Sequence, residues 1–595
     1  MKMIQNIGIG LFIVALLIFT AMLGIGHQEL STDNIGIDNA YHKEAILGAA
    51  EKSGLLNQQV GGISFISQIG SVLKDAAMVL DEKAKSGIPD GVGEWDYRIG
   101  EWKIDEYTKS IVTNTAQGPV QKNPWLFLFL TFGLATIGGL LFILPKFLAQ
   151  PGIKNNGIYH DSLTRGLQFN TKMLFLIPGI LGLVVYGFLK LQNVFWPIIT
   201  LLMAGLITYF VFIRQHSKAN NPQRHSSPVH TGWLGVIAGM YLIGFYVLLY
   251  WAPAYINNWI DMVSPVSESL SGNKASNWFL YGMMYTFIVI VMGIRMMSKY
   301  QHNKYQRIRT LSVMFFQTAF AFLIPEILVR LNQPWYDFKN IWPLDYDFFF
   351  NYNIDQLISS GGLGIFMLVW GILLIIIGVP FITYFFGKRW YCSWVCGCGG
   401  LAETMGDPFR QLSDKSMRAW KYERFIIHGV LAFAVVMTGL VLVHYFTGRS
   451  SLLGLNVEST KAWYGFLISS GFSGVVGTGF YPIMGNRVWC RFGCPLAAYL
   501  GLVQRFKSRF RITTNGGQCI SCGNCSTYCE MGIDVRSYAQ KGQDIVRSSC
   551  VGCGVCSAVC PRGVLRLENA SGDVTERTAE LRTIHITEDQ VRLLA

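Results

Sequence analysis

The sequence predicts a mainly α-helical fold: a polytopic bundle of membrane helices followed by a small cysteine-rich domain near the C-terminus. Hydrophobic residues make up 51% of the 595 residues and charged residues 14%, a balance unlike that of a soluble globular enzyme. Long apolar stretches recur along the chain. All 13 cysteines lie between Cys392 and Cys560, so we expect the metal or redox chemistry in that part of the chain.

About ten stretches are long and apolar enough to cross a hydrocarbon core of about 30 Å, which takes roughly 20 helical residues. They lie near residues 4–25, 125–145, 173–191, 195–213, 233–251, 277–297, 310–329, 361–387, 425–446 and 463–484. Glycines dilute the hydrophobicity of the last stretch, although small residues are common where membrane helices pack closely. We expect about ten transmembrane helices.

The basic residues define the expected orientation. Lysine and arginine gather in alternate loops, and the opposite loops, 252–275 and 331–360, contain one lysine each. Since cytoplasmic loops carry the positive excess, we expect both termini in the cytoplasm of a bacterium and residues 26–123 in the periplasm. The 49 Lys and Arg outnumber the 36 Asp and Glu because basic residues gather in these loops. The positive charge therefore does not indicate a nucleic-acid partner.

These patterns divide the N-terminal part of the chain into three regions. Residues 1–25 are expected to be an uncleaved anchor, with a cleaved signal peptide as the alternative. Residues 26–123 are expected to be partly helical, because apolar residues recur at helical spacing from Phe65 to Leu80. This segment contains no cysteine and suits a structural or docking role. Residues 124–360 are expected to form six membrane helices of unassigned function.

Eight cysteines near the C-terminus form two copies of C-x2-C-x2-C-x3-C. The first copy is Cys519, Cys522, Cys525 and Cys529, and the second, 31 residues later, is Cys550, Cys553, Cys556 and Cys560. In such runs three thiolates bind one 4Fe–4S cluster and the fourth binds the other cluster. We therefore expect one cluster on Cys519, Cys522, Cys525 and Cys560, and a second on Cys550, Cys553, Cys556 and Cys529.

Structural zinc also uses paired cysteines, but the duplicated runs and the closing Cys560-Pro561 favour clusters. On these motifs residues 513–568 resemble bacterial two-cluster ferredoxin domains, which implies a small α+β fold for this part. Glu530 departs from the pattern, because the first run often has proline there. Residues 569–595 follow as a C-terminal tail.

Two further cysteine motifs stand at the expected ends of membrane helices. Each combines an arginine, aromatic residues and C-x3-C, and the two copies lie 98 residues apart. Their paired C-x3-C cysteines are Cys392 and Cys396, followed by Cys398, and Cys490 and Cys494. Four thiolates from two duplicated loops can bind a metal or a further cluster, or cycle between dithiol and disulfide. Packed helix ends, with or without a structural disulfide, are the alternative.

With these motifs, residues 361–568 resemble the membrane polyferredoxin group that includes NapH, the C-terminal half of NosR and the oxidase accessory protein CcoG. Residues 361–512 correspond to the membrane part of that resemblance. Gly397 stands where the first motif of the group has proline. The resemblance to NapH and NosR implies an electron-transfer subunit that serves a redox partner outside the membrane. The resemblance to CcoG implies a maturation factor that handles copper.

Weaker signals concern haem, quinone and lipid. His428 and His444 lie 16 residues apart on one expected helix, about 24 Å along its axis, so they cannot ligate one haem together and a haem is not expected. Quinone contact remains open for them and for Glu326, which can also pair with Arg330. The basic, aromatic stretch 505–511 suits a segment lying on anionic lipid.

We therefore expect an iron–sulfur electron-transfer subunit of the inner membrane rather than a complete enzyme. It would pass electrons between the quinone pool or a cytoplasmic donor and a respiratory redox partner, beside other redox subunits. A redox-active maturation factor for a copper-containing oxidase or reductase is the alternative.

Overall fold

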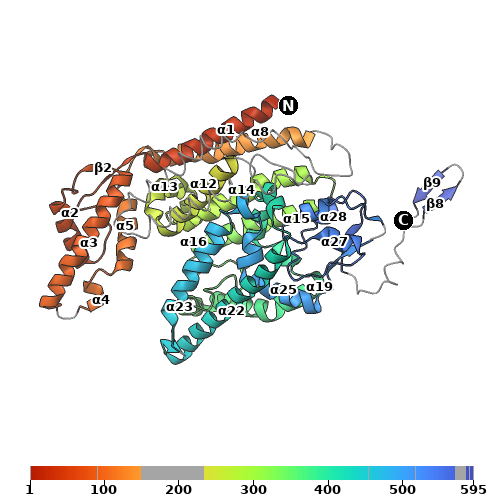
Figure 1. Ribbon diagram of the computed structural model, residues 1–595. Helices are drawn as coiled ribbons and strands as arrows, with labels where there is room; N and C mark the ends of the chain where they lie inside the picture. Colours follow the sequence, from red (N-terminus) through yellow and green to blue (C-terminus); the bar gives the residue numbers. More distant parts are fainter. Residues whose placement is uncertain are drawn as a thin grey trace. The chain divides into compact units, whose positions relative to one another are not determined.

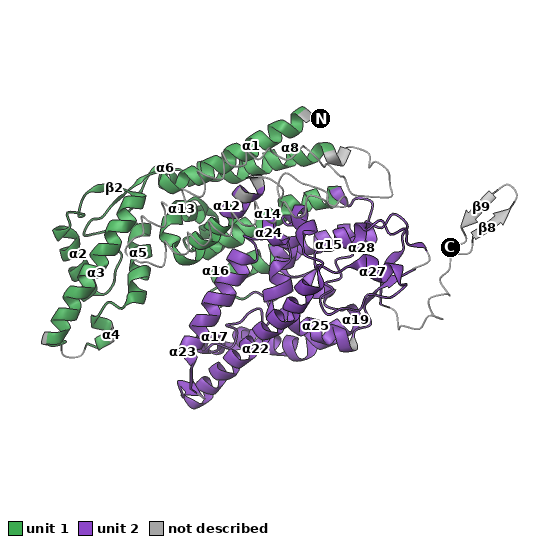
Figure 2. Cartoon of the chain, in the orientation of Figure 1, with its two compact units in different colours: residues 1–150, 241–298, 318–336 green, residues 151–240, 299–317, 337–595 purple. Residues whose placement is uncertain are grey.

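The computed structural model describes residues 2–89, 92–148, 233–452, 454–515, 518–569, 584–587 and 590–593. They are mainly helical, as predicted, and belong to two compact units (Figures 1 and 2). Unit 1 comprises residues 1–150, 241–298 and 318–336, and unit 2 comprises residues 151–240, 299–317 and 337–595.

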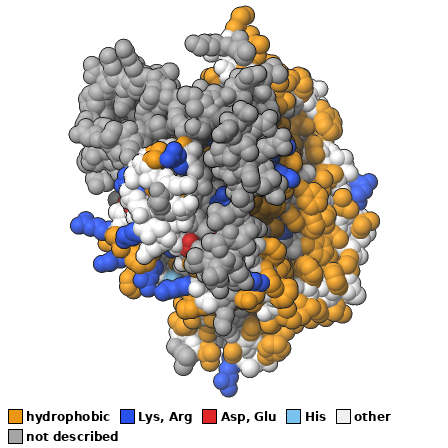
Figure 3. All heavy atoms as spheres, turned by 90° about the vertical axis from the view of Figure 1, so that its right-hand side faces the viewer, with side chains coloured by type: hydrophobic (Ala, Val, Ile, Leu, Met, Phe, Trp, Pro, Cys, Tyr) orange, Lys and Arg blue, Asp and Glu red, His pale blue; other side chains and the backbone are white. Residues whose placement is uncertain are grey.

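Among the described residues, seven helices are long and apolar enough to cross a membrane. They are Met3–Gly24, Gly62–Lys85, Pro124–Pro145, Asn277–Lys299, Lys304–Arg330, Gly361–Phe386 and Met417–Thr447. An eighth candidate is the pair Ile237–Trp251 and Pro253–Leu270, bent by 111°. Figure 3 shows hydrophobic side chains gathered over a broad part of one face of the molecule, as a surface in contact with lipid requires. The polytopic membrane fold is therefore confirmed.

Three of the predicted spans have no counterpart among these candidate helices. The stretches 173–191 and 195–213 lie outside the described residues. The stretch 463–484 is not a continuous helix: η8, a π-helix over Gly465–Val476, ends in turns before the short helix α24, Tyr481–Met484. It is not among the candidate spans of the described residues. The glycines that follow Val476 give this segment little helix propensity and little hydrophobicity.

Unit 1 begins with two apolar helices packed closely together. Helix α1 (Lys2–Ala21) crosses α8 (Leu134–Leu148), and a Cβ atom added to Gly8 would lie 2.6 Å from the carbonyl oxygen of Gly138. Close helix approach through small residues is typical of membrane proteins. Its further helices are α7 (Pro124–Leu128), η2 (Phe129–Gly133), α12 (Trp233–Trp251), α13 (Asn257–Leu270), α14 (Asn277–Lys299) and α16 (Ile324–Arg330), of which α12 and α14 also extend into unit 2.

Residues 26–123 of unit 1 form a helical domain with a small sheet. The helices are α2 (Ala40–Lys52), α3 (Gly62–Ser86), α4 (Glu94–Tyr97), α5 (Glu101–Thr115) and α6 (Pro119–Lys122), and the sheet has the antiparallel order β2-β1-β3 (Gln59–Gly61, His27–Glu29, Ala116–Gln117). The predicted apolar face of α3, from Phe65 to Leu80, is buried in the core with residues of α2 and α5. This packing explains why α3 is apolar enough to count among the candidate spans.

Unit 2 contains the cysteine motifs and the helices that position them. The helices before the second C-x3-C motif are α15 (Lys304–Phe315), α17 (Asn351–Ser359), α18 (Gly361–Leu373), η6 (Leu374–Gly378), α19 (Val379–Phe386), α20 (Arg389–Cys392), α21 (Gly397–Thr404), η7 (Asp407–Leu412), α22 (Met417–Thr447) and α23 (Val457–Tyr464). The second motif lies on η9 (Trp489–Gly493) and α25 (Pro495–Lys507). A short hairpin, β4 (Ser451–Leu452) and β5 (Leu455–Asn456), precedes α23.

The cysteine-rich domain follows α25 in unit 2. Strands β6 (Arg511–Thr514) and β7 (Leu565–Glu568) pair in antiparallel fashion and enclose three short helices, α26 (Asn524–Thr527), α27 (Val535–Gln540) and α28 (Val555–Ala558). This is the small α+β arrangement that the resemblance implied. Beyond it, β8 (Ile584–Thr587) and β9 (Gln590–Leu593) form a hairpin.

Candidate metal and redox sites

The two C-terminal cysteine runs form loops of the same shape. In each run the first two cysteines lie in an irregular loop, and the third lies on a short helix, α26 or α28. Gly523 and Gly554, which precede these helices, have φ angles of 79° and 72°, a left-handed conformation that favours glycine. The duplication predicted from the cysteine spacing is thus also a duplication of backbone structure.

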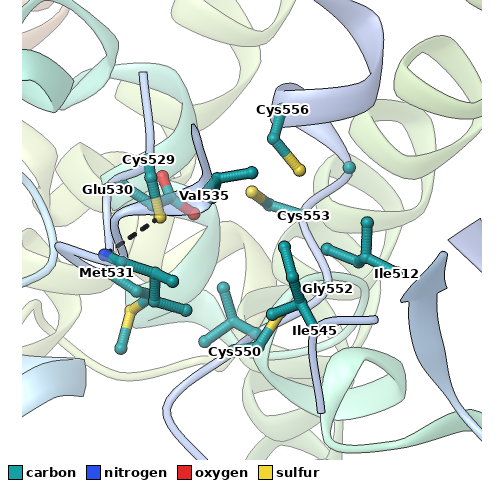
Figure 4. Close-up of a pocket in the computed structure, with 13 residues that line it drawn as sticks. Ile512, Cys529, Glu530, Met531, Val535, Ile545, Cys550, Gly552, Cys553 and Cys556 are labelled. Atoms are coloured by element: carbon teal, nitrogen blue, oxygen red, sulfur yellow. Dashed lines mark hydrogen bonds between the residues drawn. The ribbon is translucent and has the colours of Figure 1, made fainter. Parts of the chain in front are cut away.

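Cys529 joins the cysteines of the second run around one pocket. The four sulfur atoms of Cys529, Cys550, Cys553 and Cys556 turn toward one space (Figure 4). Ile512, Val535 and Ile545 give this pocket an apolar wall. The backbone N–H of Ile533 donates a hydrogen bond to Sγ of Cys529, at 3.4 Å. Four thiols with an apolar wall and an N–H donor to sulfur fit a 4Fe–4S cluster.

The other four cysteines gather in the same way. Burial raises the pKa of Cys525, and with smaller contributions from the neighbouring thiols of Cys522, Cys560 and Cys519 it reaches about 12. The other three thiols of the set therefore lie near Cys525. Cys522 is exposed and Cys525 is buried, so this set of cysteines reaches the surface of the domain. The structure therefore brings together both predicted sets of four.

Side chains from the rest of unit 2 bind the backbone of the second run. The carbonyl oxygens of four successive residues accept hydrogen bonds from three different segments, because two of the donors are neighbours on α15. The bonds run from Gln504 to Cys550 (2.9 Å), from Ser393 to Val551 (2.8 Å), from Tyr305 to Gly552 (2.9 Å) and from Gln306 to Cys553 (2.8 Å). Ser393 lies between Cys392 and Cys396, so one C-x3-C loop directly contacts the second cysteine run.

The paired C-x3-C cysteines also come together. Cys392, Cys396, Cys490 and Cys494 are all buried, and the thiols of Cys490, Cys396 and Cys392 each raise the pKa of Cys494. Cys398 joins them through a hydrogen bond with Cys396, which together with Lys339 and Arg487 lowers the pKa of Cys396 to about 6 against the effect of burial. All 13 cysteines are free thiols. A structural disulfide at the helix ends is therefore not formed in this structure.

Cationic side chains surround these thiols. Nη1 of Arg487 lies 3.6 Å from Sγ of Cys490 and 3.2 Å from the carbonyl oxygen of Cys392. Burial raises the pKa of Cys392, which stays at about 12 although Lys388 and Arg487 partly offset the rise. Lys388 also lowers the pKa of Cys550, so it lies near both the C-x3-C site and the second cysteine run. Four buried thiols and the half-buried Cys398, all near cations, are a donor set that fits a thiolate-bound metal or cluster.

A buried ion network, which the sequence did not reveal, adjoins this region. Glu403 pairs with Arg309, Arg410 and Arg487, and Glu530 pairs with Arg410 (2.6 Å) and Arg487 (3.0 Å). Burial alone would raise the pKa of Glu403, but the three arginines hold it well below its usual value. Glu403, Glu530 and Cys553 lie close enough to share a metal ion. The arginines already neutralise the carboxylates, so this group does not suit a cation.

The residues that were weaker candidates for contact with haem or quinone make ordinary hydrogen bonds. His428 and His444 bind carbonyl oxygens through Nδ1, those of Arg424 at 2.7 Å and Arg449 at 3.0 Å. The expected pairing of Glu326 with Arg330 is replaced by other contacts. Arg330 donates to the carbonyl oxygen of Ser269 at 2.9 Å, and Glu326 bonds to Trp335.

Comparison with protein families identifies both sets of motifs as iron–sulfur sequences. A model described as a 4Fe-4S binding domain matches residues 368–416 and 464–513, which contain the two C-x3-C motifs. A model described as a 4Fe-4S dicluster domain matches residues 518–565, which contain all eight C-terminal cysteines. The chain therefore has two ferredoxin-type iron–sulfur domains.

Two curated proteins are similar to part of this chain. YccM of Escherichia coli (strain K12), whose name assigns it provisionally to electron transport, is 29% identical over 163 residues, which is 26% of this chain and 44% of YccM. The methylamine utilization ferredoxin-type protein MauN of Methylobacillus flagellatus is 26% identical over 160 residues, 24% of this chain and 50% of MauN. The chain thus spans half or less of each relative. No solved structure matches it. These similarities support an electron-transfer role.

Proposed function

We propose that this protein is a membrane-bound iron–sulfur subunit that relays electrons between the quinone pool or a donor in the cytoplasm and a respiratory redox partner. The observation that carries the proposal is the sequence of three cysteine sites in unit 2. The set with exposed Cys522 reaches the surface, the set with Cys529 lies deeper, and Ser393 and Lys388 link that deeper set to the C-x3-C site.

In this proposal each C-terminal set of four cysteines holds one 4Fe–4S cluster, with Cys560 and Cys529 exchanged between the runs. Such clusters supply one-electron transfer when bound. The C-x3-C cysteines Cys392, Cys396, Cys490 and Cys494 hold a third thiolate-bound centre. In this proposal the chain resembles NapH and NosR and is a polytopic subunit of the bacterial inner membrane, with its C-terminal domain in the cytoplasm and residues 26–123 in the periplasm.

Metal analysis of the protein purified without oxygen tests this assignment. Two clusters require about eight iron and eight acid-labile sulfide per chain, and a third 4Fe–4S centre raises both to about twelve. Zinc without sulfide would refute it. A reporter fused after Ala595 should be active only in the cytoplasm, and activity on the opposite side would refute the proposed orientation. Subunits that co-purify would identify the redox partners.

One observation favours a second candidate function, that of a copper-handling maturation factor. Cys398 lies with the four paired C-x3-C cysteines, and a single 4Fe–4S cluster needs only four thiolates. Soft thiolates also select Cu(I). Copper bound in a fixed ratio to the chain, and lost when Cys398 is replaced by serine, would favour this function over a relay.

A further inference from the structure

Each of the two C-x3-C motifs begins with an arginine at the same position. Arg389 stands three residues before Cys392, and Arg487 stands three residues before Cys490. The duplicated sequence therefore gives the two arginines no distinguishing feature. In the structure both lie in unit 2, but the groups that they contact differ.

Arg389 binds the cysteine-rich domain. Its Nη2 donates a hydrogen bond to Oδ1 of Asn569, just after β7, at 2.9 Å, and this bond is exposed to solvent. Its guanidinium carbon lies 4.5 Å from the ring centroid of Phe510, just before β6, which is a cation–π contact. Arg389 therefore suits a role in holding the paired strands β6 and β7 against the first C-x3-C loop.

Arg487 lies between the two C-x3-C loops, and its side chain is buried. Its Nη1 lies 3.6 Å from Sγ of Cys490, in its own motif, and 3.2 Å from the carbonyl oxygen of Cys392, in the other motif. A Cβ atom added to Gly399 would lie only 3.1 Å from the same nitrogen. Arg487 is therefore packed against both loops, and one of its N–H groups faces a thiol of the candidate third centre.

The other nitrogen of the same guanidinium group is held by carboxylates. Nη2 lies 2.7 Å from Oε1 of Glu403 and 3.0 Å from Oε1 of Glu530. Because a guanidinium group is planar and rigid, fixing Nη2 also fixes the direction in which Nη1 points. Both carboxylates also pair with Arg410, and Glu403 pairs with Arg309 as well. The charge of Arg487 is therefore shared within a network and is not cancelled by a partner of its own.

The ion pairs of this network join four cations to three carboxylates, so positive charge is in excess. The members are Lys299, Arg309, Arg410 and Arg487, with Glu403, Asp407 and Glu530. A cluster held by four thiolates carries net negative charge, which is costly to bury without a counter-charge. Hydrogen bonds to the cluster sulfurs and the net charge around the cluster both affect its reduction potential. The N–H group of Arg487 that faces Cys490 supplies both.

We propose that Arg487 is a positioning residue for the centre on the paired C-x3-C cysteines. It donates a hydrogen bond to Sγ of Cys490 and raises the reduction potential of that centre, whereas Arg389, its counterpart in the first motif, binds the cysteine-rich domain. This inference rests on the proposed third centre. It assigns different functions to two arginines that the duplicated sequence makes equivalent.

The test is a redox titration of the purified full-length protein, followed by the EPR signals of its clusters. Arg487→Met should make the third centre harder to reduce, by at least a tenfold change in the ratio of reduced to oxidised centre at a fixed potential, or about 59 mV for one electron. Arg389→Met, which removes the arginine at the same position of the first motif, is the matched control. It should leave that ratio within about threefold of the wild type, because solvent screens its charge.

A further variant separates the contact with sulfur from the charge of the network. Arg410→Met removes another cation from Glu403 and Glu530 and should shift the potential of the third centre less than Arg487→Met does. The inference is overturned if Arg389→Met or Arg410→Met produces the same shift as Arg487→Met, or if Arg487→Met leaves the potential unchanged.

If Arg487→Met loses about four iron atoms per chain, iron analysis of Arg487→Lys takes the place of the titration. Iron retained in Arg487→Lys would support the inference, since lysine keeps the charge and N–H donors, and the same loss in both variants would overturn it. The signal of the cluster with exposed Cys522 is the internal reference and should not move. Wild-type protein with only about eight iron atoms and no third signal would overturn the third centre and this inference with it, whereas a third signal that ignores Arg487→Met overturns the inference alone.

Discussion

Nη1 of Arg410 lies 2.6 Å from Oε2 of Glu530, and both side chains are almost fully buried. Arg410 belongs to η7, shortly after the first C-x3-C motif, and Glu530 follows Cys529, a proposed cluster ligand. The hydroxyl of Ser413 also donates to the carbonyl oxygen of Glu530 at 2.6 Å. This residue, which replaces the proline often found in ferredoxin runs, is therefore one of the points where the cysteine-rich domain is bound to the C-x3-C region, together with Val551.

Removing Arg410 should destabilise the protein strongly. Arg410→Met leaves the carboxylates of Glu530 and Asp407 with fewer partners in a region without solvent, and breaking a buried ion pair costs about 3–5 kcal/mol. Thermal unfolding in detergent measures the loss. Arg98→Met is the control, because the ion pairs of Arg98 with Asp81 and Glu94 are exposed and should contribute less than about 1 kcal/mol. Equal effects of the two changes would contradict this interpretation of the network.

The exchange of cysteines between runs predicts which cluster each substitution removes. Cys529→Ser should abolish the signal of the cluster held with Cys550, Cys553 and Cys556, although it lies in the first run. Cys560→Ser should abolish the other cluster. Each change should lower the iron content by about four atoms per chain. Clusters lost in the reverse order would show that each run binds its own cluster, and loss of the same cluster from both variants would contradict either assignment.

The sequence predicted which nearby residues act together better than it predicted contacts between residues far apart in the chain. The cysteine sets followed from ligand spacing, because metal geometry fixes that spacing within a few residues. Glu530 was recognisable as a departure from the pattern, but its partner Arg410 lies 120 residues away and no periodicity connects them. Lys339 counted in the sequence only as the one basic residue of the loop 331–360, and nothing there predicted that it would be buried in an ion pair with Asp337 at 3.0 Å.

Cys398 and Cys396 should behave differently when replaced. If Cys392, Cys396, Cys490 and Cys494 hold a 4Fe–4S centre, Cys396→Ser removes a ligand and should lower the iron content by about four atoms per chain. Cys398→Ser removes the fifth thiol and should leave the iron content unchanged. Iron and copper analysis of the two variants side by side checks this. Iron loss from Cys398→Ser with retention in Cys396→Ser would mean that the fourth ligand is Cys398.

The close packing of α1 and α8 predicts that alanine substitutions at two glycines of α1, only two residues apart, have opposite effects on hydrogen exchange. A Cβ atom on Gly8 would lie 2.6 Å from the carbonyl oxygen of Gly138, a contact that backbone must move to relieve, whereas a Cβ atom on Gly10 meets nothing within 4 Å. Alanine favours a helix over glycine by about 1 kcal/mol, so Gly10→Ala should slow hydrogen exchange in α1. Gly8→Ala gains the same propensity but separates the helices, and packing strain of about 1–3 kcal/mol should exceed that gain. Hydrogen–deuterium exchange of residues 2–21 measures both variants, and slower exchange in Gly8→Ala would mean that the two helices do not pack through this pair of glycines.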